Sequence, residues 1–131
     1  MYAFYRIITL LVSPFIPLLL RSRLAKGKED AARLQERLGH SLVVRPAGKI
    51  VWIHAASVGE ANASLPLIDA LLKANSALHI LLTTVTVTSA ALMKDRLPER
   101  SIHQFAPVDT LFAVRRFLDH WKPDVALWVD S

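Results

Sequence analysis

Residues 50–60 read IVWIHAASVGE, an apolar run that passes directly into a loop of small and polar residues. The run Ile50–Ile53 predicts a strand that is buried on both faces, as in a parallel sheet covered by helices. A second apolar run, HILLT at residues 79–83, follows after a stretch with helical periodicity. The two runs are about 30 residues apart, which is typical of a βαβ unit.

The chain continues this alternation on both sides. A polar helix over residues 29–38, closed by Gly39, comes before the first strand. After the second strand we expect a helix at 89–97, a weak strand at 102–105, an amphipathic helix at 111–121 and a buried strand at 125–129. This order predicts an α/β fold with a Rossmann-like parallel sheet, whose ligands bind at the carboxyl ends of the strands. The four glycines form no G-x-G-x-x-G motif, so a dinucleotide fingerprint is excluded.

The N-terminal segment has a different character. An uninterrupted apolar-rich run covers Ile7–Leu20, close to the length of about 20 residues that a helix needs to span a bilayer. Pro14 and Pro17 would kink such a helix, which lipid-embedded helices tolerate. The stronger charge follows the run, unlike the order in a cleaved signal peptide. We expect residues 1–22 to form a membrane anchor or membrane-associated helix; the alternative is an apolar helix packed on its own domain.

The net charge of +5 on these 131 residues is local. Residues 21–49 hold eight basic and three acidic side chains, and the remainder of the chain is neutral. A basic stretch beside an apolar one indicates a membrane surface, with the basic end on the cytoplasmic side. Aromatic and basic residues are not interleaved in this sequence, so the pattern gives no indication of nucleic-acid binding. We therefore divide the chain into the anchor, a basic linker and helix at 23–48, and a Rossmann-like domain at 49–131.

The loop after the first strand has the richest chemistry. Small side chains around Ser57 and Gly59 allow a ligand to approach the backbone closely. The carboxylate of Glu60 could act as a general base on a sugar hydroxyl, a role that contributes a factor of about 10²–10⁴ in rate. Ser57 to Glu60 also matches the capping-box pattern S-x-x-E. Pro66 favours a later helix start, at Asn62 or Ser64, so both interpretations of Glu60 stand.

Other polar residues follow the remaining strands. His54 ends the first strand and is expected to be a hydrogen-bonded structural residue. Among the hydroxyls of residues 83–88 we expect about half to bond backbone groups at a helix start, while others, Thr84 and Thr86, line a sugar or phosphate site. Asp109 is expected to cap the next helix. Asp130 directly follows the last buried strand and is a stronger candidate for the site.

The sequence stops at Ser131, where an active-site loop would begin. A central parallel strand normally leads into a helix that covers one face of the sheet. We therefore expect this sequence to be a fragment of a longer protein.

Several segments together resemble the N-terminal part of the 3-deoxy-D-manno-octulosonic acid (Kdo) transferases of lipopolysaccharide biosynthesis. The specific block is WIHAASVGE at residues 52–60. Weaker matches are the apolar N-terminus with its basic flank and, in order, ERLG at 36–39, PLI at 66–68, TTVTVT at 83–88, PVD at 107–109 and PD at 123–124.

The resemblance implies the N-terminal domain of a GT-B glycosyltransferase. It implies transfer of Kdo from CMP-Kdo to a lipid A precursor at the cytoplasmic face of the inner membrane, without a metal or bound cofactor. Glu60 would be the base and Asp130, usually glutamate in the family, would support the transition state. The domain that binds the CMP donor is absent, so we expect this chain to be inactive alone. The alternative is a non-catalytic, membrane-tethered module that binds an anionic lipid or a protein partner.

Overall fold

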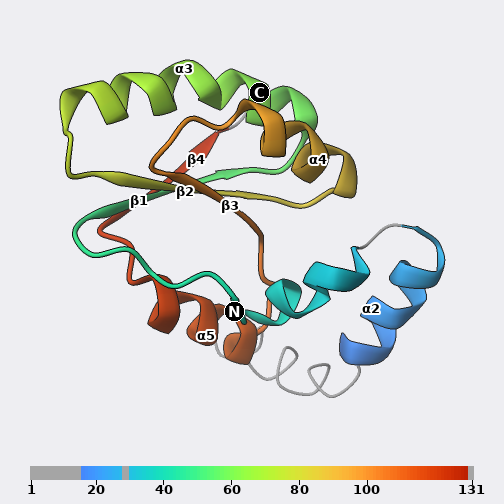
Figure 1. Cartoon of the computed structure of the whole chain (residues 1–131). Coiled ribbons are helices and arrows are strands. Elements are labelled where there is room, and N and C mark those ends of the chain that lie inside the picture. The colour runs from blue at the N-terminus through green and yellow to red at the C-terminus, as the bar shows by residue number, and fades with distance from the viewer. Residues whose placement is uncertain (1–15, 28–29, 130–131) are drawn as a thin grey trace, which may run out of the picture.

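A computed structural model describes residues 16–27 and 30–129 of the chain (Figure 1). Its elements are α2 (Ile16–Ala25), the 3₁₀ helix η2 (Ala31–Leu38), β1 (Ile50–Ala55), α3 (Val58–Ala74), β2 (His79–Thr84), α4 (Val87–Arg96), β3 (Ser101–Phe105), α5 (Leu111–Trp121) and β4 (Val125–Val129). Every strand predicted from the sequence is present. The predicted bounds of the last helix and the last strand agree with the structure residue for residue, but the last strand is largely exposed and the prediction that it is buried is wrong.

The four strands form one parallel sheet in the order β3-β2-β1-β4. The first two strands are in register from the pair Ile50 and His79 to the pair His54 and Thr83, and β4 pairs with the other edge of β1. All strands therefore end at the same edge of the sheet. This arrangement confirms the predicted α/β fold.

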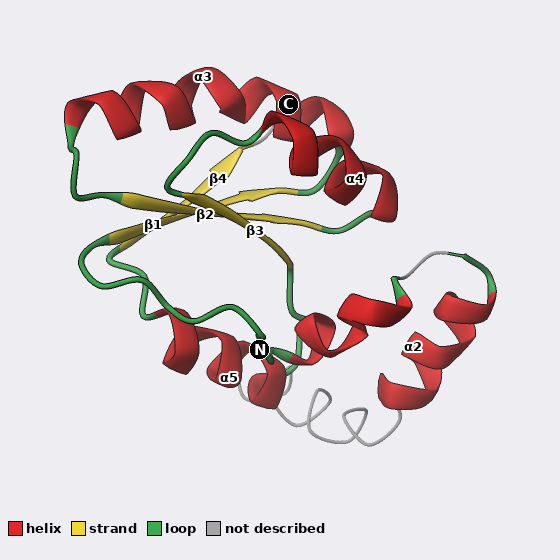
Figure 2. Ribbon diagram, in the orientation of Figure 1, coloured by secondary structure: helices red, strands yellow, loops and turns green. Residues whose placement is uncertain are grey.

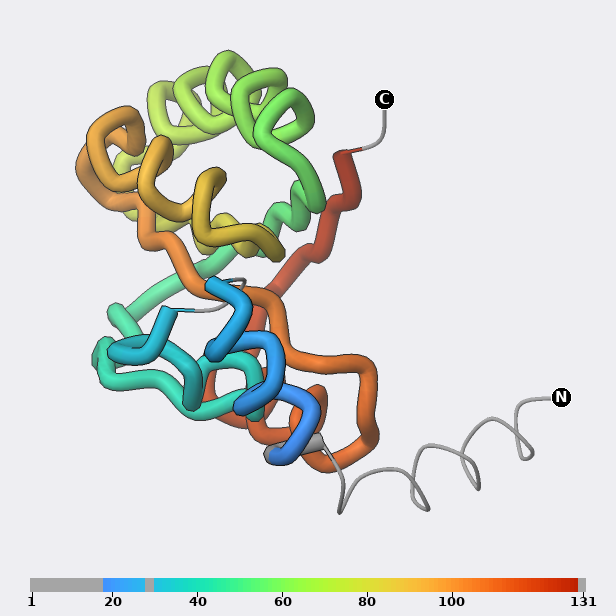
Figure 3. Tube along the Cα trace, turned by 90° about the vertical axis from the view of Figure 1, so that its right-hand side faces the viewer, coloured from blue at the N-terminus to red at the C-terminus, as the bar shows by residue number. Residues whose placement is uncertain are grey.

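Helices cover both faces of the sheet (Figure 2). Helices α3 and α4 lie on one side, while α5, η2 and α2 lie on the other, as the view turned by 90° also shows (Figure 3). We call these two sides the α3 face and the α5 face. The core of the α3 face is apolar and closed. The core of the α5 face is smaller and consists of Ile50, Trp52, Leu81, Phe117 and Trp121.

Gly39 ends η2 and allows it to approach α5 closely. Its φ of 89° lies in the left-handed region, and a Cβ atom there would come within 2.2 Å of the Ala113 carbonyl oxygen. Glycine is the residue that satisfies both demands. The predicted end of this helix is confirmed.

Two charged residues anchor η2 to the end of β3. Arg33 forms an ion pair with Glu36 at 2.7 Å, and its guanidinium lies 4.6 Å from the centre of the Phe105 ring. Glu36 in turn accepts a hydrogen bond of 2.8 Å from the Phe105 N–H. Part of the basic segment recognised in the sequence therefore serves packing within the protein.

The predicted membrane segment falls mainly on residues 1–15, outside the described residues. Of its remainder, Leu20 is buried, while Leu18 and Leu19 on the same helix are 61% and 55% exposed. Within the described ranges, no helix combines the length and the apolar character needed to cross a membrane.

Candidate functional site

The carboxyl ends of β1 and β4 define the expected ligand edge. From β1 the chain proceeds to β2 and β3 on one side and returns to β4 on the other. In open parallel sheets, ligands bind outside the carboxyl ends of the strands where the order reverses in this way. The loop with Ser57, Gly59 and Glu60 leaves β1 at this point.

Glu60 lies in the first turn of α3. The helix begins at Val58 with Ser57 as its N-cap, and the Ser57 hydroxyl accepts a hydrogen bond of 3.2 Å from the Glu60 N–H. The Glu60 carboxylate accepts a hydrogen bond of 2.9 Å from the Ala56 N–H. A helix start at Asn62 or Ser64 is therefore wrong, and the capping interpretation holds for the backbone. Glu60 is half-buried, so part of its side chain is still exposed to solvent.

Pro66 misled the sequence interpretation because it lies inside α3. An interior proline removes one helical hydrogen bond and costs about 3 kcal/mol. The Ser57 cap and the burial of Ala61, Ile68 and Leu72 against the sheet offset this cost.

Gly59 and Ser57 are both exposed at the start of the helix. A Cβ atom at position 59 would meet nothing closer than the Ser57 hydroxyl oxygen, at 4.0 Å. The backbone at this turn is therefore open to a ligand, as the small residues of the loop predict.

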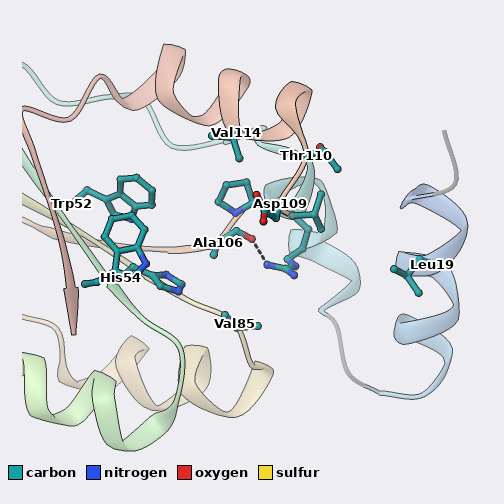
Figure 4. A pocket seen from close by; sticks show the side chains of 12 residues that line it. Leu19, Trp52, His54, Val85, Ala106, Asp109, Thr110 and Val114 are labelled. Carbon is teal, nitrogen blue, oxygen red and sulfur yellow. Dashed lines mark hydrogen bonds between the residues drawn. The ribbon is translucent and has the colours of Figure 1, made fainter. Parts of the chain in front are cut away.

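A cavity of about 810 Å³ opens on the α5 face. His54 at the end of β1 lines it, whereas residues 55–60 of the following loop do not. Figure 4 shows that its walls come from the ends of several strands and from α2, η2 and α5. Most of the wall is apolar, and the polar groups include Arg37, His54 and Asp109. Its lining consists of Leu19, Arg37, Trp52, His54, Val85, Ala106, Pro107, Val108, Asp109, Thr110, Val114 and Trp128.

His54 is a residue of β1 and lines this cavity. Its Nδ1 lies 2.8 Å from the Thr83 hydroxyl oxygen, which confirms the predicted hydrogen-bonded role. Its ring centre lies 5.7 Å from that of Trp128. Burial lowers the pKa of His54 below its ordinary value of 6.5, the Glu60 carboxylate opposes this shift, and the Arg37 cation adds to it. A neutral imidazole and a carboxylate thus flank the end of β1.

The two threonines predicted to bind substrate have different surroundings. Thr84 is fully buried, and its hydroxyl lies 2.6 Å from Nε2 of His103. It does not reach the surface of the cavity, because the neighbouring strand β3 supplies this internal partner. Thr86 is exposed and caps α4, where its hydroxyl accepts from the Ser89 N–H at 3.1 Å.

Asp109 has a different role from the one expected. Thr110, one residue after Asp109, is the N-cap of α5, so the predicted capping role of Asp109 is wrong. Asp109 is exposed and lines the cavity instead. Asp130 lies outside the described residues.

Arg37 was not predicted from the sequence as a site residue. It donates a hydrogen bond from Nη1 to the Ala106 carbonyl oxygen, the dashed line in Figure 4, and its side chain lines the cavity. The position is separated from Glu60 by an entire strand and a loop, so no local spacing reveals it. Among the described residues, no three His, Cys, Asp or Glu side chains come together as a metal site.

The fold and this edge define a Rossmann-like α/β domain with a carboxylate and a cavity toward the carboxyl edge of its sheet. Residues 32–131 match the family model described as 3-deoxy-D-manno-octulosonic-acid transferase (kdotransferase). The chain belongs to this family.

Relatives with this name cover nearly the whole chain. A probable mitochondrial 3-deoxy-D-manno-octulosonic acid transferase of Arabidopsis thaliana is 44% identical over 130 residues, which are 99% of this chain and 29% of that protein. The transferase of Rickettsia bellii is 34% identical over 131 residues, 100% of this chain and 31% of that protein. The transferase of Haemophilus influenzae is 30% identical over 129 residues, 98% of this chain and 30% of that protein. The chain thus spans about 30% of the length of these relatives.

Proposed function

We propose that this chain is the acceptor-side domain of a glycosyltransferase that transfers Kdo from CMP-Kdo to a lipid A precursor. The observation that supports this most strongly is the position of Glu60, a half-buried carboxylate after the carboxyl end of β1, whose charge raises the pKa of the cavity-lining His54. The names of the relatives supply the sugar. The GT-B arrangement, with a second domain for the donor, belongs to the same proposal.

In the proposed reaction Glu60 is the general base. Its carboxylate takes the proton from an acceptor hydroxyl as that oxygen forms a bond to the anomeric carbon of Kdo. The bond from this carbon to the phosphate oxygen breaks, and CMP leaves with the electron pair. Ser57, Gly59 and Thr86 would contact substrate, whereas buried Thr84 would act through His103. Asp130 is proposed to support the transition state.

We further propose that the domain works at the cytoplasmic face of the inner membrane. Leu18 and Leu19 are exposed on α2. Arg21 on the same helix and Lys26 in the turn that follows it are also exposed. Exposed leucines beside cations suit an anionic lipid surface, where each cation contributes about 1 kcal/mol. This placement would bring the acceptor lipid to the cavity that Leu19 lines.

The decisive test is Glu60→Gln in the full-length protein. Glutamine keeps an oxygen that can accept from the Ala56 N–H, so stability should change by less than about 0.5 kcal/mol, while the base is removed. We expect Kdo transfer to fall by a factor of about 10²–10⁴. Asp69→Asn, an exposed carboxylate on the same helix, is the matched control and should transfer Kdo normally.

Normal turnover by a stable Glu60→Gln protein would contradict the assignment of the base. The second candidate function is a non-catalytic module that binds an anionic lipid, and the first-turn hydrogen bond of Glu60 favours it because a cap needs no chemistry. In that case Glu60→Gln would bind lipid vesicles as the unmodified protein does, and neither protein would transfer Kdo.

A further inference from the structure

His54 has a hydrogen-bond arrangement that the proposed base does not require. The series of hydrogen bonds starts with Trp52, whose indole N–H can only donate a hydrogen bond. This N–H lies 2.8 Å from the hydroxyl oxygen of Thr83, which is fully buried. Thr83 therefore accepts a hydrogen bond from Trp52.

The proton of the Thr83 hydroxyl must then find an acceptor. Nδ1 of His54 lies 2.8 Å away on the neighbouring strand. If Nδ1 carried a proton, the Thr83 oxygen would receive two N–H groups, and its own buried proton would lose this partner. The arrangement that satisfies every group has Thr83 donating to Nδ1, so that the imidazole proton is on Nε2.

The ring carrying this proton faces the cavity. His54 is one of the residues that line it, and Figure 4 shows the imidazole between the tryptophan side of the wall and the open space. Among the described residues, the hydrogen bond of the His54 ring is made by Nδ1, and none is made by Nε2. The charged groups around the ring are Glu60 from α3, Arg37 from η2 and, on the opposite wall, Asp109.

We infer that His54 is a further substrate-contacting residue of the site, a neutral imidazole oriented by Thr83 that donates its Nε2–H to an oxygen of the acceptor sugar or its phosphate. This inference rests on the proposed function for the identity of the ligand. Its geometry is that of a fixed donor: Thr83, itself bonded to Trp52, holds the ring through Nδ1, and the ring lines the cavity. Arg37 supplies the positive charge on another wall of the same cavity.

Burial keeps the imidazole neutral by lowering its pKa. A neutral donor suits an acceptor hydroxyl that must later lose its proton to Glu60, because it orients the oxygen without competing for that proton. An imidazolium would instead pair with the Glu60 carboxylate and weaken the base.

The tautomer is tested first, on the 131-residue chain, by long-range ¹H–¹⁵N NMR correlation of the histidine ring. At pH 7 we expect His54 to be neutral with its proton on Nε2, and Thr83→Val to shift it toward a mixture of tautomers. A proton on Nδ1, or a charged ring at pH 7, would overturn the inference whatever the enzyme does.

The substrate contact is tested by steady-state transfer assays on the full-length protein. His54→Phe should raise the KM for the lipid A precursor about tenfold, with kcat changed less, because one hydrogen bond to the substrate is lost. His54→Gln keeps an N–H donor and should recover most of the affinity. His120→Phe, a histidine on α5 that bonds to the Val43 carbonyl, is the control and should leave KM unchanged.

The outcomes separate the two proposals. An unchanged KM in His54→Phe, or an equal loss in the phenylalanine and glutamine variants, would overturn the role of His54 and leave the proposed reaction in place. Failure of the unmodified protein to transfer Kdo would overturn the proposed function, and the inferred contact with it.

Discussion

The two faces of the sheet are built on different principles. On the α3 face, apolar side chains such as Ile53, Ile68, Ile80 and Met93 are fully buried and form a continuous core. On the α5 face, Trp52 and Phe117 make a smaller core, and toward the carboxyl edge it gives way to polar groups and a cavity of about 810 Å³. The difference indicates that one face supplies most of the stability and that the other has room for a ligand. Glu60 begins the helix that covers the first face, at the edge shared with the second.

The largest effect on stability is expected on the α3 face. Ile53→Ala removes a fully buried side chain from the central strand, and we expect the free energy of unfolding to fall by about 2–5 kcal/mol. Val85→Ala, a partly buried position in the cavity wall, should cost less than about 1.5 kcal/mol. Urea denaturation of both variants would measure this. Equal losses would show that the two faces do not differ as we describe.

The contact between η2 and α5 is the next most sensitive feature. Gly39→Ala combines a left-handed backbone with a Cβ atom 2.2 Å from the Ala113 carbonyl oxygen, and should cost more than about 2 kcal/mol. Gly27→Ala has a similar φ of 74° but no atom within 4 Å, so it should cost about 1 kcal/mol. Thermal unfolding of the pair separates backbone strain from overlap. A Gly39→Ala protein as stable as Gly27→Ala would argue against the close packing of η2 on α5.

The partly buried polar contacts of His103 on the edge strand β3 should make stability depend on pH. Burial, and then the Arg33 cation, lower the pKa of His103 from 6.5 to about 3. Nδ1 accepts from Arg33 at 2.9 Å, so the folded state requires the neutral ring. The unfolded chain binds the proton first, so this contribution is complete above pH 6.5 and is lost as the pH falls toward 3.

Near pH 5 the expected slope from this residue is about 1.4 kcal/mol for each pH unit. Urea denaturation between pH 7 and about 4.5 would measure the slope, with His103→Gln as the comparison because it cannot take up the proton. Parallel slopes in the two proteins would contradict the buried, neutral state of His103.

Regular structure was predictable because it depends on local patterns. The apolar run Ile50–Ile53 and the periodicity of residues 111–121 each fix an element without reference to the rest of the chain. Pro66 is one exception, since its local cost is outweighed by packing that only the folded sheet provides. The exposed strand β4 is another.

The site was predictable only in part. The loop with Ser57 and Glu60 is contiguous, so its position after β1 could be read from the sequence. Thr84 is buried and bonded to His103, which comes from another strand. Thr110 directly precedes the predicted helix start at Leu111 and is the cap, so Asp109 lies one residue too early for that role. The cavity draws on six separate segments, and no spacing in the sequence brings Arg37 to it.

The most direct test of a ligand site at the edge shared by the two faces is backbone NMR of the 131-residue chain during titration with a deacylated lipid A precursor. We predict saturable chemical-shift changes at residues 54–60, at Val85 and at residues 106–110. Amides of the closed core, such as those of Ile68 and Leu72, should remain unchanged. Saturable changes confined to the outer surface of α3 or to α4, with none at residues 54–60, would contradict the account.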